Sequence, residues 1–341
     1  VNVKGEYYFC TGRVRELEET TRNGYVESMR RAITNYGATI GSHNGGFPNI
    51  GVADNWAYDY WHWGPDTMID QTTGFPDVLP YGPYTSGYSY AKDSIERSFD
   101  DLEGWFANLD NGRVGCGVLD LCPRTWVSPY FNSGRDRSFK ILEEVGSITM
   151  GEQKISPFPH WTLSYDPANP DPRYNHLTLP PSDWYVGNRI SQSMEDGHSI
   201  ASVQALVDFY YQKGYLINMY GHQSSLNGPL MRPYIDYNLG KPNIWATNAV
   251  GLHDWWQKRD ALIITPTFTK VGNSAQVTVG ISGSDDEGTA IEVVLPYWSS
   301  GAVKNLVVKL DGEAASESAF RTTDYGVKIK VGIGVANVQV D

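Results

Sequence analysis

The sequence has little positive charge and no long hydrophobic run, and each absence argues against a class of partner. Lys and Arg account for 27 of the 341 residues against 39 Asp and Glu, which gives a net charge of -12. Phosphate binding depends on clusters of Lys and Arg, so we expect no nucleic acid partner. No segment approaches the roughly 20 apolar residues that a membrane-spanning helix needs. The remaining composition, with 40% hydrophobic and 19% charged residues, is typical of a globular chain.

Cysteine is also scarce. The three cysteines, Cys10, Cys116 and Cys122, show no Cys-x-x-Cys spacing, which argues against a zinc knuckle and a dithiol redox motif. Cys116 and Cys122 could pair across a loop and leave Cys10 in a strand, and the spacing alone leaves this open. The chain begins at Val1 without an initiator Met or a signal-type apolar segment. We therefore expect either that a leader has been removed or that a longer polypeptide continues upstream.

Aromatic residues are abundant, with 11 Trp and 22 Tyr. Many of them fall in residues 44–90, a segment rich in Gly and Pro that is too long for a simple connection. Trp and Tyr combine a flat apolar face with a polar edge, which suits them to stacking on sugar rings. We therefore expect a polysaccharide ligand, with residues 44–90 and 155–185 shaping its groove. The alternative is that these aromatic residues anchor irregular loops.

Apolar periodicity predicts alternating strands and helices up to about residue 260. Three helices are predicted to end at Gly37, Gly146 and Gly214. Such alternation indicates an α/β fold, a parallel sheet or a (β/α) barrel, with chemistry at the carboxyl ends of its strands. His43 and His222 each directly follow a predicted strand. The predicted strands are 5–11, 38–42, 113–119, 215–220 and one more within 147–185, and the predicted helices are 22–36, 89–108, 135–145, 198–213 and 243–258.

The pattern changes near residue 260. Val, Ile and Thr then alternate with polar residues between turns rich in Gly, Asn, Asp and Ser. This predicts a C-terminal antiparallel β-sandwich of the immunoglobulin or fibronectin type over residues 261–341, after an α/β domain over residues 1–260. Its predicted strands are 262–269, 275–282, 289–296, 302–309 and 326–340.

Several segments of the first domain, taken in their order along the chain, resemble the motifs of the polysaccharide deacetylase family, carbohydrate esterase family four, also called the NodB-homology domain. These segments are Val3–Phe9, Ile40–His43, Ser128–Tyr130, Asp183–Trp184 and Ile217–His222. The resemblance implies a distorted (β/α) barrel of the polysaccharide deacetylase type. It also implies metal-dependent hydrolysis of an amide or ester on an acetylated polysaccharide, with zinc as the first choice of divalent metal.

The resemblance implies a role for individual residues. His43 would be a metal ligand, His222 the general acid, and Tyr130 the donor of a backbone amide to the oxyanion, with Asp183 a further catalytic residue. Two positions depart from the family pattern, because Phe47 stands in place of the second metal histidine and Val127 in place of an arginine. His62 or Asp59 could replace the missing ligand, and Arg124 or Arg135 the missing arginine. The expected substrate-binding residues are Trp61, Trp63, Trp126 and Trp184.

These departures leave alternatives open. The family's first strand has no counterpart, and we expect an upstream segment of the same polypeptide to complete the barrel. The main alternative to a deacetylase is a catalytically silent barrel that binds carbohydrate or has a structural role in a secreted or cell-surface protein. A third is a glycosidase that uses two carboxylates from Asp54, Asp59 and Asp183. The histidines expected to be structural or solvent-exposed are His160, His176, His198 and His253.

Overall fold

The computed structural model of the chain forms two compact units, Val1–His253 and Asp254–Asp341. The division falls within a helix, and the boundary predicted at residue 260 falls near the end of the same helix. Each unit is described by itself below. The structure describes residues 5–43, 61–62, 67–69, 76–77, 87–107, 123–128, 136–151, 156–180, 199–221, 229–242, 244–272, 274–283, 289–294, 306–323 and 326–341.

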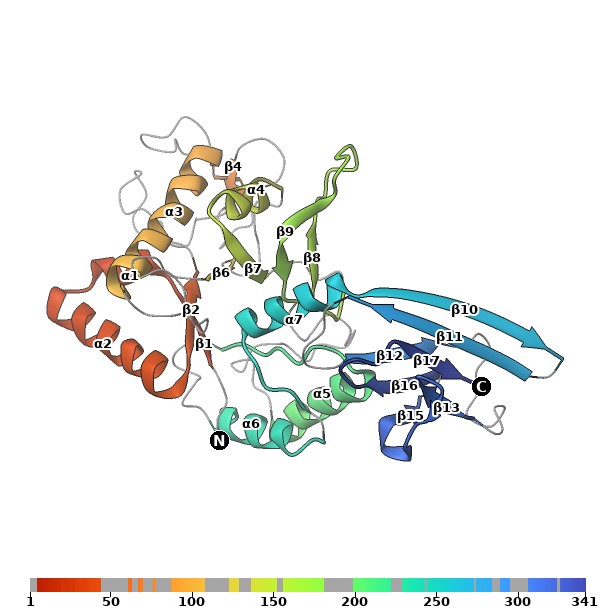
Figure 1. The fold of residues 1–341 in the computed structure, drawn as a ribbon. Coiled ribbons are helices and arrows are strands. Elements are labelled where there is room, and N and C mark those ends of the chain that lie inside the picture. Colours follow the sequence, from red (N-terminus) through yellow and green to blue (C-terminus); the bar gives the residue numbers. More distant parts are fainter. Residues whose placement is uncertain are drawn as a thin grey trace. The chain divides into compact units, whose positions relative to one another are not determined.

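A six-stranded sheet organises the first unit (Figure 1). Its strands, in chain order, are β1 (Glu6–Phe9), β2 (Thr39–Ser42), β6 (Arg124–Val127), β7 (Ser147–Gly151), β8 (His160–Leu163) and β9 (Arg173–Thr178). A small sheet also contains β3 (Trp61–His62), β4 (Thr67–Ile69) and β5 (Pro76–Asp77). The helices are α1 (Thr11–Glu16), α2 (Glu19–Tyr36), α3 (Gly87–Trp105), α4 (Asp136–Glu144), α5 (Ile200–Lys213), α6 (Met231–Leu239) and α7 (Ala249–Ala261), which continues into the second unit.

The strand order of the large sheet is β1-β2-β6-β7-β9-β8. The first five strands are parallel, and β8 pairs antiparallel with β9 at the edge. Successive parallel strands therefore advance across the sheet in one direction, as in a barrel, whereas a doubly wound sheet reverses at a switch point. Among the described strands the sheet stays open between β1 and β8. The mixed α/β fold is thus confirmed, and closure into a barrel stays a prediction.

Helices α2, α3 and α4 cover one face of this sheet. The apolar side chains of the strands on that face, including Ile40, Trp126 and Met150, form one core with helix residues such as Phe99 and Phe139. The opposite face meets the beginning of α7. There the backbone N–H of Ala249 donates to the Glu6 carboxylate over 2.9 Å, and the Trp161 ring meets the His253 ring edge-on at 5.9 Å.

Four helices lie where their periodicity predicts them, as α2, α3, α4 and α5. Gly37 and Gly214 end α2 and α5 in the left-handed region, with φ of 64° and 70°. The helix predicted at 243–258 is present as α7, although it begins only at Ala249. The strand predicted at 215–220 is wrong, because residues 215–219 form none. The backbone of that segment bonds instead to the chain before β8, where Leu216 N–H donates to the Pro157 carbonyl.

The second unit contains two antiparallel sheets. One has the order β10-β11-β17-β13-β14 and the other β12-β16-β15, and valine and isoleucine side chains from both form a single core. Antiparallel sheets were predicted here, whereas the immunoglobulin-like topology stays a prediction. The strands are β10 (Ile263–Val271), β11 (Ser274–Ser282), β12 (Thr289–Val294), β13 (Val308–Leu310), β14 (Glu313–Ala314), β15 (Phe320–Thr322), β16 (Gly326–Val331) and β17 (Asn337–Val340), with a 3-10 turn, η3 (Glu317–Ala319).

Candidate functional site

His43 lies directly after β2, at the carboxyl end of the parallel sheet. Its backbone N–H continues the ladder with β1 by donating to the Phe9 carbonyl over 2.8 Å. Its half-buried ring reaches the end of β6, where Nδ1 lies 3.0 Å from the carbonyl oxygen of Val127. Residues 84 positions apart in the chain thus meet at the edge of the sheet where parallel α/β folds place their chemistry.

This hydrogen bond determines the tautomer of His43. A carbonyl oxygen only accepts, so Nδ1 carries the proton and donates it to Val127. In the neutral ring, the lone pair then resides on Nε2. Histidines that bind metals usually donate their other ring N–H to a carbonyl or carboxylate in this way, which fixes the orientation of the ring. The geometry of His43 therefore suits a metal ligand or a general base.

The residues on the α7-facing side of the sheet are polar near Glu6. Gly41 lies beside Tyr8 in register and is so closely approached by Tyr8 and Thr125 that a larger side chain would force these neighbours to shift. Burial raises the pKa of Glu6, although the Ala249 N–H and the hydroxyls of Tyr8 and Thr125 lower it in part. Burial also raises the pKa of Tyr8 well above its ordinary value. Since Glu6 bonds the first residue of α7, its role is to hold that helix on the sheet.

Two of the predicted site residues have structural roles instead. Trp126 is wrong as a sugar-stacking residue, because its side chain is 1% exposed and lies in the core under the helices. Arg124 does not replace the missing arginine. It stands at the amino end of β6, where its guanidinium binds Glu103 and the Val145 carbonyl, far along the strand from His43.

Most other predicted site residues lie outside the described residues. Trp61 and His62 form β3, but their side chains lie outside the description. Trp61 as a substrate contact and His62 as a metal ligand therefore stay predictions. Among the described residues, no group of three or more His, Cys, Asp or Glu could hold a metal ion. His43 thus fits one ligand of a metal site, and any further ligands would come from other residues. The predicted site residues that lie outside the described residues are Tyr130, Asp183, His222, Trp63, Trp184, Asp54, Asp59 and Arg135.

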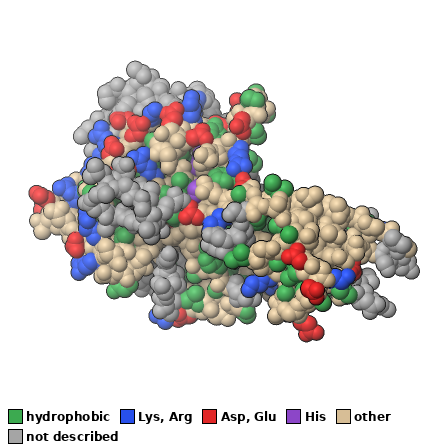
Figure 2. All heavy atoms as spheres, viewed as in Figure 1, with side chains coloured by type: hydrophobic (Ala, Val, Ile, Leu, Met, Phe, Trp, Pro, Cys, Tyr) green, Lys and Arg blue, Asp and Glu red, His purple; other side chains and the backbone are tan. Residues whose placement is uncertain are grey.

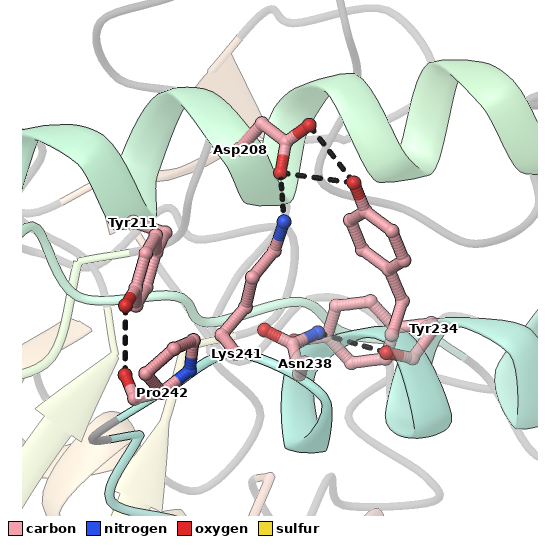
Figure 3. Close-up of polar contacts among 7 residues, drawn as sticks. Asp208, Tyr211, Tyr234, Asn238, Lys241 and Pro242 are labelled. Atoms are coloured by element: carbon pink, nitrogen blue, oxygen red, sulfur yellow. Dashed lines mark hydrogen bonds and ion pairs between the residues drawn. The ribbon is translucent and has the colours of Figure 1, made fainter.

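A polar cluster that the sequence analysis did not single out joins α5 to the end of α6 (Figure 3). Lys241 forms an ion pair with Asp208, and its ammonium lies 4.1 Å from the centre of the Tyr237 ring. The Tyr237 hydroxyl donates to both oxygens of Asp208, at 3.0 and 2.9 Å. The hydrogen bond from Lys241 lowers the pKa of Asp208. Nearby, the Tyr211 hydroxyl donates to the Pro242 carbonyl, so the whole cluster fixes the turn after α6.

Comparison with known proteins identifies no family. No family model and no curated protein matches the chain. Among solved structures, the chain is similar to the crystal structure of Puue allantoinase, with 13% identity and a TM-score of 0.41. The similarity covers 69% of this chain and 64% of the allantoinase chain. A similarity this distant supports no assignment of activity. No helix among the described residues is long and apolar enough to cross a membrane.

Proposed function

We propose that the first unit is a metal-dependent hydrolase that removes acetyl groups from a polysaccharide by amide or ester hydrolysis. The observation that supports this proposal is the position of His43 at the carboxyl edge of a parallel sheet. The Nδ1–H of this histidine donates to the Val127 carbonyl. In this tautomer Nε2 is the ring atom with a lone pair, as a metal ligand requires. The order of the motifs around it in the sequence supports the same function.

The residues of the chain would divide the chemistry among them. A divalent metal, bound by His43 and with His62 as a candidate second ligand, would supply Lewis acidity toward the acetyl carbonyl and a more acidic water. Tyr130 would donate its backbone N–H to the oxyanion, and His222 would protonate the leaving group. Asp183 is the further catalytic candidate. Trp61, Trp63 and Trp184 would stack on the sugar rings.

The test compares two histidine variants of the full chain, His43→Ala and His160→Ala. Both rings are half-buried and have Nδ1 beside a backbone carbonyl, and His160 lies on the antiparallel edge strand β8. We expect the wild type to bind zinc stoichiometrically and to release acetate from acetylated chitooligosaccharides or xylan. His43→Ala should lose about 100-fold or more in metal affinity, and His160→Ala should keep it. Zinc binding and acetate release that survive in His43→Ala would refute the assignment.

A second candidate function is a catalytically silent barrel that binds carbohydrate or has a structural role. Val127 favours it, because the resemblance expects an arginine there and the valine side chain instead packs closely against Gly151 on β7. A valine supplies no charge or hydrogen bond to a reacting group. We expect such a module to bind glycans without releasing acetate and to lose that binding in Trp61→Ala and Trp63→Ala. Affinity unchanged in both variants would count against the proposed groove.

A further inference from the structure

His176 on β9 is a histidine without a polar partner. Its side chain is 0% exposed, and neither Nδ1 nor Nε2 has a hydrogen-bond partner among the residues that the structure describes. A neutral imidazole carries one N–H donor and one acceptor, and buried polar groups of this kind are nearly always paired. The site therefore tolerates the neutral ring at some cost and, among the described residues, offers a charged ring no hydrogen-bond acceptor.

Aromatic rings surround His176 where β9 packs against α4. The Phe139 ring, from α4, meets the imidazole edge-on with ring centres 6.0 Å apart. The Tyr174 ring, from β9 itself, lies 5.8 Å away. Phe139 is 0% exposed, so this contact lies in the interior of the layer between α4 and the sheet.

Two carboxylates of α4 face the β8–β9 hairpin, and both bind other donors. Asp136 accepts hydrogen bonds from the Ser164 hydroxyl, the Tyr165 N–H and, over 2.9 Å, the Tyr174 hydroxyl. Glu143 accepts the N–H of Asn175 over 3.0 Å. These bonds connect both ends of α4 to the β8–β9 hairpin.

The neighbouring strands supply no countercharge either. On β8 the ionisable side chain is His160, whose Nδ1 lies beside the Phe158 carbonyl, and β7 has none. The guanidinium of Arg173, on β9, lies over the Trp161 ring, 4.3 Å from its centre. Among the carboxylates of the described residues, a charged His176 could therefore gain a partner only by displacing a bond that holds α4.

We propose that His176 makes the contact between α4 and β9 sensitive to acid, so that protonation of its ring detaches α4 from the sheet. The fold supplies both requirements of such a switch, a titratable group buried without a hydrogen-bond partner and a helix whose polar contacts with the hairpin are a few replaceable hydrogen bonds. This inference concerns the response of the fold to pH and does not depend on the proposed hydrolase activity.

The sign and size of the effect follow from the two states of the ring. Burial lowers the pKa of His176 to about 3 in the closed state, while an exposed ring in the open state has a pKa of about 6.5. The open state therefore binds more protons, and opening becomes more favourable as the pH falls below 6.5. Between pH 7.5 and pH 5, the opening equilibrium of α4 should increase about 30-fold.

Hydrogen exchange of α4 amides in the full chain, followed by mass spectrometry, tests the proposal. After correction for intrinsic exchange rates, protection of residues 137–144 in the wild type should fall about 30-fold between pH 7.5 and pH 5. Helix α3 should lose much less protection over the same range. Two variants without an ionisable ring, His176→Leu and His176→Asn, should abolish the fall in α4, and His160→Gln should leave it unchanged.

Three results would overturn the proposal. Unchanged α4 protection in the wild type would overturn the proposal directly, whether or not the variants fold. A fall of the same size in His176→Leu or His176→Asn would show that another group causes the opening. A fall that is equal in α3 and α4 would indicate global unfolding and would likewise overturn it.

Discussion

Gly41 offers a test of how tightly the sheet is packed directly beside His43. A Cβ atom at this position would lie 2.7 Å from Cε1 of Tyr8 and 2.8 Å from the carbonyl oxygen of Thr125, and closer still to the Thr125 hydroxyl. Carbon atoms in real structures do not approach so closely. The Thr125 hydroxyl and the Tyr8 ring could move, but the Thr125 carbonyl belongs to the backbone of β6. The variant Gly41→Ala must therefore push neighbouring strands apart.

The expected cost comes from known overpacking effects. Inserting a methyl group into a packed core costs about 1–3 kcal/mol, and because one contact is with backbone we expect the upper part, about 2–3 kcal/mol. For a unit of this size, each kcal/mol lowers Tm by about 2–4 °C. Gly41→Ala should therefore lower the Tm of the first unit by about 4–12 °C.

Differential scanning calorimetry of the full chain is the assay, with Gly104→Ala as the matched control. Gly104 is exposed in α3 and a Cβ there meets no atom within 4 Å, so alanine should stabilise the helix by about 0.5–1 kcal/mol. The two variants thus shift the same transition in opposite directions. Removing the Thr125 hydroxyl in Gly41→Ala/Thr125→Ala should restore at least about 0.5 kcal/mol relative to additivity. An unchanged Tm in Gly41→Ala would refute the packing argument.

Two further predictions concern ionisable groups. Lys241→Met should return the pKa of Asp208 upward toward its ordinary value, because the hydrogen bond from Lys241 is the main cause of its lowering. A carboxyl NMR titration measures this, and Arg232→Met, which breaks an exposed pair with Asp236, should leave Asp208 unchanged. Glu6 has a raised pKa in the folded state, so its contribution to stability is complete below its unfolded pKa and is lost as the pH rises through the folded value. Denaturant unfolding of Glu6→Gln should show no such loss, and equal pH dependence in both proteins would contradict this reading.

The helices of the first unit were predictable because their signals are local. A 3.6-residue apolar period and a glycine that enters the left-handed region identify α2 and α5 without knowledge of any distant residue. The β1–β2 pair was equally clear, since two short apolar runs flank α2. The change to alternating Val, Ile and Thr near residue 260 likewise marks the antiparallel sheets of the second unit.

The errors arise where a neighbour distant in the chain decides the structure. The short strand β6, with four residues, carries no period of its own, so Trp126 looked like an exposed aromatic residue although the helices bury it. Residues 215–219 are apolar enough for a strand but bond to the chain beside Pro157 instead. His43 bonds the backbone carbonyl of Val127, and because every residue has such a carbonyl, the sequence does not indicate this partner.

On the face of the sheet that meets α7, the amino ends of the strands have different contacts from the carboxyl ends. Glu6 lies near the amino end of β1, and the first residue of α7 sits directly on its carboxylate. His43 directly follows β2, two residues after Gly41 and therefore on the same face of the sheet. Its ring contacts the carbonyl of Val127, the last residue of β6. The first residue of α7 therefore contacts the sheet at the level of Glu6 and Thr39. Parallel α/β folds place their chemistry at the carboxyl ends of their strands, and His43 is an ionisable side chain at that end of the described sheet.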